Sequence, residues 1–154
     1  MKFWDSSAIV PLLVEEEHSP ACRSLFRSDP DMAVWQLTLT EATSALSREW
    51  HADRLDDAAF QQAERKLTRI ASRWRELRAL DDAALDALRA EARRILRAHP
   101  LRAADALQLA AACLFFEHPM KHGFVVLDAA LARAAEAEGF TVLAPAKGGR
   151  RKSS

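Results

Sequence analysis

The sequence predicts an α/β fold in which helices cover both faces of a parallel β-sheet. Short apolar runs alternate along the chain with longer segments that have helical periodicity. The apolar runs are continuous, which is typical of strands that are buried on both faces. With 154 residues, of which 49% are apolar, the chain is long enough for one ordinary domain with a buried core.

Polar residues and proline define the first strand and the first two helices. The apolar run at residues 2–5 ends in an acid and predicts the first strand. A pair of serines then opens a helix over residues 8–16. A second helix, over residues 21–27, begins after a Ser-Pro pair and ends at an Asp-Pro-Asp sequence.

The next elements are a strand and two longer helices. Residues 33–37 predict the second strand, and Thr38 or Thr40 caps a helix over residues 39–51. Residues 56–74 have apolar side chains on one helical face, which predicts a long amphipathic helix.

The middle of the chain holds one ambiguous segment and one unusual helix. Residues 76–80 predict a third strand, but their alternation is weak and a continued helix is the alternative. Two aspartates begin a helix over residues 81–98, which a His-Pro pair ends. In the helix predicted over residues 101–116, Asp105 and Gln108 are the only polar side chains after position 102. We therefore expect this helix to be buried on most sides.

The last elements complete the expected domain. Residues 124–127 predict the clearest strand, and residues 129–138 predict a helix that Gly139 ends. Residues 141–143 predict a short final strand. We expect one domain over residues 1–146 and a disordered basic tail over residues 147–154, because the tail is rich in Gly, Arg, Lys and Ser.

The charges are segregated although the formal net charge is zero. Residues 1–60 contain 11 acidic and 5 basic side chains, whereas residues 61–102 contain 6 acidic and 11 basic ones. This asymmetry suggests that cations and polyanions bind side by side. The alternative is that the arginine-rich helices are solvated and that their charges stabilise each other one turn apart.

Several classes of protein are disfavoured. No apolar run reaches the roughly 20 residues of a membrane helix. The acid at position 5 would interrupt the apolar core of a signal peptide. Cys22 and Cys113 are too few for a disulfide framework or a cysteine-built metal site, so we expect each to pack as a small apolar residue. A cytoplasmic location fits best.

Three acids follow strands of the predicted parallel sheet. Asp5 and Asp128 come directly after strands, and Glu41 lies in the first turn of the helix after the second strand. Ligands bind at the carboxyl ends of parallel strands, so we expect these side chains at one edge. Asp105 lies on an apolar helix and needs a partner or a metal there. Gln108, three residues on, could donate a hydrogen bond to it.

Converging carboxylates repel one another unless they are protonated or bind a hard divalent cation such as Mg²⁺ or Mn²⁺. Acids beside a basic segment suit a phosphodiester substrate better than a sugar or a peptide.

Each acid also has a simpler interpretation. Asp5 and Asp128 could only cap helices, Glu41 could only favour a helix N-terminus, and Asp105 could pair with Arg102.

Together these residues resemble the motifs of the PIN-domain family, and in particular the VapC-type toxins of bacterial toxin–antitoxin pairs. The match follows the family's order and spacing over about residues 1–143. Its most specific segment is Arg-x-x-Asp-Ala-Leu-x-Leu-Ala at positions 102–110. The matching segments are Trp4-Asp5-Ser6-Ser7-Ala8, Thr38-Leu39-Thr40-Glu41, Leu101 to Ala110 and Val125-Val126-Leu127-Asp128.

The resemblance implies a three-layer α/β/α sandwich and a Mg²⁺- or Mn²⁺-dependent endoribonuclease that cuts RNA, often tRNA or rRNA. It also implies a cognate antitoxin that holds the enzyme inactive, and a homodimer. Ser7 would support the first aspartate, and Arg102 would orient Asp105 or meet phosphate. Arginines between positions 65 and 97, with the basic residues at 150–152, would contact backbone phosphates. The implied catalytic acids are Asp5, Glu41, Asp105 and Asp128, of which all but Glu41 would be the nearer metal ligands.

Two positions depart from the family pattern. Val126 stands where many relatives have Thr or Ser, and Gln108 stands where many have His.

Three other functions were weighed. The chain could be a PIN-like nuclease without an antitoxin, or a non-enzymatic helical interaction module. A phosphatase with an aspartate nucleophile is disfavoured, because Ser7 stands where that chemistry needs a second aspartate.

Overall fold

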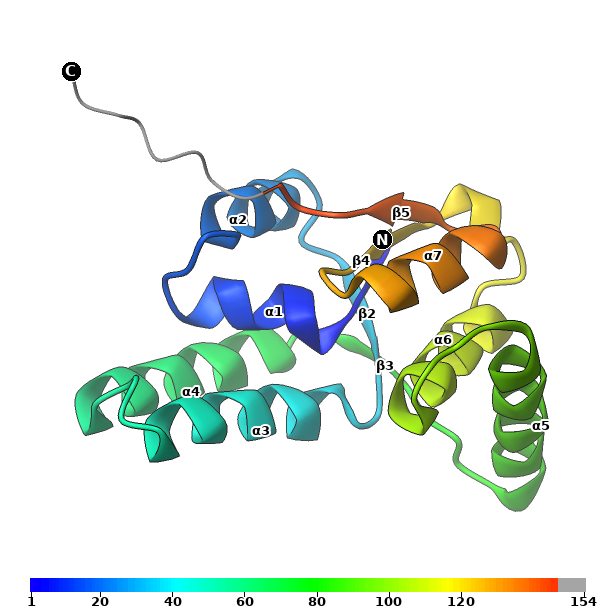
Figure 1. Cartoon of the computed structure of the whole chain (residues 1–154), viewed down its shortest axis with the longest axis horizontal. Coiled ribbons are helices and arrows are strands. Elements are labelled where there is room, and N and C mark those ends of the chain that lie inside the picture. Colours follow the sequence, from blue (N-terminus) through cyan, green and yellow to red (C-terminus); the bar gives the residue numbers. More distant parts are fainter. Residues whose placement is uncertain (147–154) are drawn as a thin grey trace.

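Five short parallel strands form the centre of the molecule in the computed structural model, which describes residues 1–146 (Figure 1). The strand order is β3-β2-β1-β4-β5, and every neighbouring pair is parallel. The basic tail expected at residues 147–154 lies outside the described residues. The strands are β1 (Lys2–Trp4), β2 (Met32–Trp35), β3 (Arg75–Leu77), β4 (Gly123–Val125) and β5 (Thr141–Leu143).

The helices begin mostly at capping aspartates. Asp5, Asp56, Asp81 and Asp128 each accept a hydrogen bond from a backbone N–H group in the first turn of the helix that follows. Gly139, with φ +96°, follows the last helix as predicted. The helices are α1 (Ser6–Leu13), α2 (Ser19–Ser28), α3 (Thr38–His51), α4 (Asp57–Ala71), α5 (Asp82–Ala98), α6 (Ala103–Phe115) and α7 (Ala129–Ala137), with a 3₁₀ helix η1 at Pro119–Lys121.

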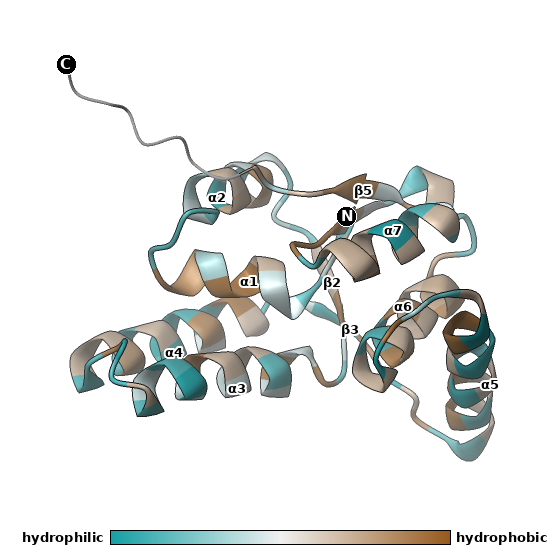
Figure 2. Cartoon of the chain, viewed as in Figure 1, coloured by the Kyte–Doolittle hydropathy of each residue, from teal (hydrophilic) through white to brown (hydrophobic). Residues whose placement is uncertain are grey.

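The sheet has an apolar core on each face, so the predicted three-layer sandwich is confirmed. Neighbouring strand residues point to opposite faces, and Phe3 and Trp4 accordingly belong to different cores. Phe3 packs with residues of α5, α6 and α7, whereas Trp4 packs with residues of α1, α3 and α4. Figure 1 shows α3 and α4 together, apart from α5 and α6, and Figure 2 shows mixed hydrophobic and hydrophilic residues on α3, α4 and α5.

Two details of the helices differ from expectation. The amphipathic helix α4 ends at Ala71, three residues early, and the chain then enters β3. The third strand predicted over residues 76–80 therefore exists, over Arg75–Leu77, and the alternative of a continued helix is wrong. The centre of α6 is buried as expected, but Leu114 and Phe115 in its last turn are exposed. Among residues 1–146, no helix is both long and apolar enough to cross a bilayer.

The strand order creates a crevice at the middle of the sheet. From β1 the chain continues to β2 and β3 on one side, and later to β4 and β5 on the other. The helices that follow β1 and β4, α1 and α7, therefore start side by side at the carboxyl edge of the sheet. In open parallel sheets, this point of reversal is where ligands bind.

Candidate functional site

Asp5 lies at the base of this crevice, between β1 and α1. It is the N-cap of α1, and its Oδ2 accepts hydrogen bonds from the backbone N–H of Ser7, at 3.0 Å, and from the Ser7 hydroxyl. The backbone N–H of Leu127 in turn donates to Ser7 Oγ at 3.0 Å. Ser7 therefore joins Asp5, through hydrogen bonds, to the chain that leaves β4.

Gln108 holds the second oxygen of the Asp5 carboxylate. Its Nε2 donates to Asp5 Oδ1, and its side chain is buried in the middle of α6. The expected hydrogen bond from Gln108 to Asp105 is not among those formed by residues 1–146. Asp105 and Gln108 are three residues apart on α6, which is less than one full turn, so their side chains do not point in the same direction. Gln108 can therefore point toward Asp5 while Asp105 faces the opening of the crevice. The amide therefore fixes the deepest acid and leaves Asp105 accessible.

The other three acids line a cavity of about 740 Å³, which Ser7, the hydrogen-bond partner of Asp5, also lines. Glu41 comes from the first turn of α3, Asp105 from the first turn of α6, and Asp128 from the N-cap of α7. Asp128 Oδ1 accepts a hydrogen bond from Leu131 N at 2.8 Å. Asp128 and Asp5 thus do cap helices, and they contribute to an acidic crevice at the same time.

Two of the acids have raised pKa values, in part because the acids lie close to one another. Burial, and then the charges of Asp5 and Asp105, raise the pKa of Glu41 to about 7. Burial, followed by the charges of Asp5 and Asp128, also raises the pKa of Asp105. The four acids predicted from separate segments of the chain therefore interact with one another.

Basic residues do not neutralise this crevice through direct pairing. Within residues 1–146, none of the ion pairs involves Asp5, Glu41, Asp105 or Asp128. Arg102 lines the cavity, and its positive charge partly offsets the rise in the pKa of Asp105. Arg102 and Asp105 do not form the direct ion pair that was the alternative interpretation of Asp105.

The chemistry of the donor set fits a hard divalent cation. Glu41 Oε2 and Gln108 Oε1 are buried and have no hydrogen-bond partner within the described part of the chain. Carboxylate oxygens are the ligands that Mg²⁺ and Mn²⁺ prefer. Within residues 1–146, ligand atoms of Asp5, Asp105 and Asp128 do not all lie within 4.8 Å of one another.

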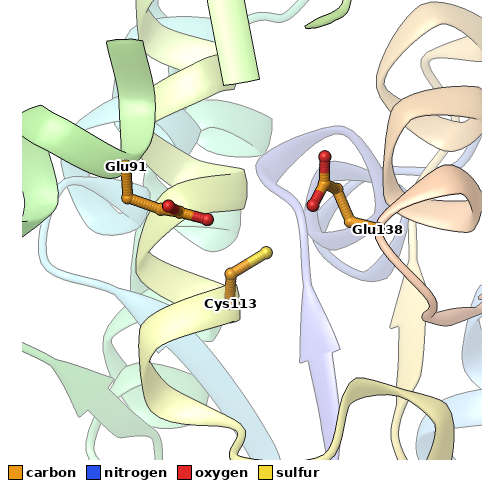
Figure 3. Close-up of side chains that lie close together, drawn as sticks. All are labelled: Glu91, Cys113 and Glu138. Carbon is orange, nitrogen blue, oxygen red and sulfur yellow. The ribbon is translucent and has the colours of Figure 1, made fainter. Parts of the chain in front are cut away.

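A second cluster lies on the α5–α6–α7 side of the sheet. Glu91, Cys113 and Glu138 point toward one another from α5, α6 and the end of α7 (Figure 3). One ligand atom from each lies within 4.8 Å of the others, close enough to hold a metal ion. Burial, and then the charges of Glu138 and Glu91, raise the pKa of the Cys113 thiol to about 12. A neutral thiol is consistent with the expectation that Cys113 packs as a small apolar residue, and it does pack against the core that contains Phe3.

Arg94 and His99 already contact the acids of this second cluster. Arg94 Nη2 lies 2.7 Å from Glu91 Oε1 and 2.6 Å from Glu138 Oε2, and His99 Nε2 lies 2.8 Å from Glu138 Oε1. A metal ion here would compete with the Arg94 guanidinium for both carboxylates. The cluster acts in this structure as an ion-pair network that joins α5 to the end of α7.

Sequence analysis missed Arg48, which also lines the acidic cavity. The sequence held a signal for it, because Arg48 follows Glu41 by seven residues and so lies on the same face of α3.

Val126 is fully buried in the core that contains Phe3. The residue that departs from the family pattern thus packs in the core and does not line the crevice.

Comparison with known proteins supports the fold. No family model and no curated protein sequence matches the chain. A chain of a toxin–antitoxin complex from Klebsiella pneumoniae is similar in structure, with a TM-score of 0.61 and 12% identity, over 96% of this chain and 99% of that one. PAE2754 from Pyrobaculum aerophilum aligns with a TM-score of 0.58 and 20% identity, over 92% of this chain and 87% of that one.

Proposed function

We propose that this chain is a Mg²⁺- or Mn²⁺-dependent endoribonuclease of the PIN-domain type, acting as the toxin of a toxin–antitoxin pair. The observation that carries the proposal is the convergence of Asp5, Glu41, Asp105 and Asp128 on one crevice, without an ion-pair partner among the described residues. A structural relative from a toxin–antitoxin complex supports the biological role.

The acids have distinct roles in this proposal. Asp5, Asp105 and Asp128 would hold the cation, and Ser7 and Gln108 would fix the orientation of Asp5. The chemistry that a divalent cation supplies at such a site is a more acidic bound water and neutralisation of charge on a phosphate. Glu41 Oε2, which is buried and unpartnered, would position the attacking water.

Two arginines at the crevice favour a phosphodiester substrate. Arg48 and Arg102 line the cavity together with the acids. Their guanidinium groups would contact the phosphates on either side of the scissile bond, which positions the strand without reading its bases. The proposed partners are an RNA substrate, an antitoxin protein and a second copy of the chain, with residues 1–146 as the nuclease domain.

The decisive experiment compares RNA cleavage by the wild type, Asp5→Asn and Asp86→Asn in the presence of Mg²⁺ or Mn²⁺. Asp86 lies on the exposed face of α5, and among residues 1–146 its one ion-pair partner is Arg89, so it is a matched control. We expect Asp5→Asn to lower the cleavage rate by about 100-fold or more and Asp86→Asn to leave it unchanged. Equal cleavage by wild type and Asp5→Asn would refute the proposed site.

The toxin role needs a separate measurement. Expression of the chain alone should arrest growth and produce discrete RNA fragments, whereas the Asp5→Asn variant should do neither. Co-expression with a cognate antitoxin protein should restore growth. If the chain cleaves RNA in vitro but its expression does not affect growth, the proposed nuclease activity stands and the proposed toxin role is wrong.

A further inference from the structure

Oxygen, sulfur and nitrogen atoms meet in the second cluster, which the proposed catalytic function does not use. Glu91 on α5, Cys113 on α6 and Glu138 at the end of α7 point toward one another (Figure 3). A ligand atom from each lies within 4.8 Å of the other two. The imidazole of His99 is next to them, with Nε2 2.8 Å from Glu138 Oε1. The cluster is therefore chemically mixed and not only acidic.

The spacing of these atoms is close to that of a zinc site. Bonds of about 2.0 Å to oxygen and about 2.3 Å to sulfur place the ligands of a tetrahedral zinc ion roughly 3.3–3.8 Å apart. Side chains whose ligand atoms already lie within 4.8 Å of one another reach this spacing through small rotations. Cys113 is only partly buried, and the side chains of Glu91 and Glu138 are 23% and 14% exposed, so an ion can enter from solvent.

The position of Arg94 shows independently that the cluster attracts a cation. Its Nη2 lies 2.7 Å from Glu91 Oε1 and 2.6 Å from Glu138 Oε2, so one positive group bridges both carboxylates. The Arg94 side chain is 48% exposed and long, and it can turn into solvent and leave the two acids to another cation. A metal ion can therefore take the place of the guanidinium without a change in the helices.

The sulfur of Cys113 determines which metal ion the cluster favours. Mg²⁺ and Mn²⁺ favour oxygen ligands, whereas zinc accepts thiolate and carboxylate ligands together. Zinc binds the thiolate form of cysteine, and the proton of the thiol passes to solvent. The acids of the crevice supply only oxygen atoms. The two sites of this chain thus differ in the class of cation that their ligand atoms suit.

We propose that the Glu91–Cys113–Glu138 cluster is a zinc site, in which Cys113 Sγ and one oxygen from each carboxylate bind the ion and Arg94 turns away from both acids. A water molecule completes the tetrahedron. His99 keeps its hydrogen bond to Glu138 and orients that carboxylate as a positioning residue. The ion joins α5, α6 and the end of α7 at one point and so stabilises this layer of the sandwich. The proposal is independent of whether the acidic crevice cleaves RNA.

Cobalt(II) tests the sulfur ligand directly, because it replaces zinc and gives an intense charge-transfer absorption when a thiolate binds it. The full chain titrated with Co²⁺ should show this absorption, and Zn²⁺ should abolish it. Cys113→Ala should lack it, whereas Cys22→Ala, at the other cysteine of the chain, should retain it. Co²⁺ bound in the acidic crevice does not interfere, because carboxylates do not produce this absorption.

The competition with Arg94 predicts a change of opposite sign. The dissociation constant for Zn²⁺ is measured against a chromogenic chelator, with Mg²⁺ in excess. Cys113→Ala should raise it at least about tenfold, because a ligand is lost. Arg94→Gln should lower it by about threefold or more, because the guanidinium no longer holds both carboxylates. Arg89→Gln, which breaks an exposed ion pair elsewhere on α5, is the control and should leave it unchanged.

Three results would overturn the zinc site. The first is a wild type that gives no charge-transfer absorption with Co²⁺, and the second is an absorption that persists in Cys113→Ala. The third is a dissociation constant for Zn²⁺ that stays at the wild-type value in both Cys113→Ala and Arg94→Gln. Circular dichroism spectra that match the wild type will show that each variant is folded.

Discussion

Gln108 Nε2 donates a hydrogen bond to Asp5 Oδ1, which joins two side chains that are 103 positions apart in the sequence. The bond ties the middle of α6 to the end of β1. Both side chains are nearly inaccessible to water. The amide therefore orients the deepest acid of the crevice and, at the same time, fixes α6 against the sheet.

Replacement of Gln108 by Leu should reduce the stability of the fold. Leu has a similar size but cannot donate to the buried Asp5 carboxylate, and hydrogen bonds to charged groups contribute more than neutral ones. We expect the free energy of unfolding to fall by about 2 kcal/mol, measured by urea denaturation. Gln62→Leu, on the exposed side of α4, should change it far less. An equal effect of both changes would contradict the assigned role.

Glu41→Gln should stabilise the metal-free protein at alkaline pH. The pKa of Glu41 is raised from 4.5 to about 7 in the folded state, first by burial and then by Asp5 and Asp105. The folded protein thus binds more protons than the unfolded chain between these values, and its free energy of unfolding falls as the pH rises through this window. Glutamine removes the repelled charge.

The variant and wild type should therefore have similar stability below pH 4.5, and Glu41→Gln should be more stable at pH 8 by about 1 kcal/mol. Thermal unfolding with a chelator present at both pH values measures the difference. Glu64→Gln, at an exposed position of α4, serves as the control. A difference that stays constant with pH would show that Glu41 ionises normally in the fold.

Local patterns in the sequence predicted the fold well, because apolar runs and capping residues act over a few positions. Asp81 begins its helix as predicted, whereas Asp5, and not the expected serine pair, caps α1. Asp128 caps α7, as its simpler interpretation required. The rule that parallel strands end at one edge of a sheet predicted that Asp5 and Asp128 lie at the same edge. Asp105 could not be placed in this way, because another helix precedes its helix, and only its burial cost and the family resemblance indicated a role.

Contacts between distant segments were not predictable from these patterns. The side chain of Gln108 has two neighbours of similar chemistry, Asp105 and Asp5, and only the rotation of α6 on the sheet selects Asp5. The Glu91–Cys113–Glu138 cluster likewise depends on how three helices pack, and its residues have no metal-ligand spacing along the chain. The exposed end of α6 also differs from the prediction, because the helix extends beyond the part that packs against the sheet.

Asp105→Asn should separate the two candidate metal sites. A cation that binds the folded state raises the melting temperature by mass action. We expect Mg²⁺ or Mn²⁺ to raise the melting temperature of the wild type, and Asp105→Asn to lower the cation affinity at least about tenfold. Cys113→Ser, in the second cluster, should keep the wild-type shift. A shift lost in Cys113→Ser and retained in Asp105→Asn would place the cation at Glu91 and Glu138 instead.

Arg94→Gln should destabilise the protein at neutral pH and much less in acid. Hydrogen bonds from Arg94 and His99 lower the pKa of Glu138, so this carboxylate contributes stability above its ordinary pKa of 4.5. That contribution is lost as the pH falls through the lowered value. Without Arg94, the carboxylates of Glu91 and Glu138 face each other beside Cys113 and repel.

We expect Arg94→Gln to lower the free energy of unfolding by about 1 kcal/mol at pH 7, since Arg94 is half exposed but bridges two acids. The loss should be smaller at pH 3 than at pH 7, because the contribution of Glu138 is lost as the pH falls through its lowered pKa. Urea denaturation of wild type and variant at the two pH values measures it. Arg89→Gln removes a single exposed pair, with Arg89 Nη1 3.4 Å from Asp86 Oδ1, and should have almost no effect at either pH. If Arg94→Gln behaves like Arg89→Gln, the bridge from α5 to the end of α7 does not stabilise the fold.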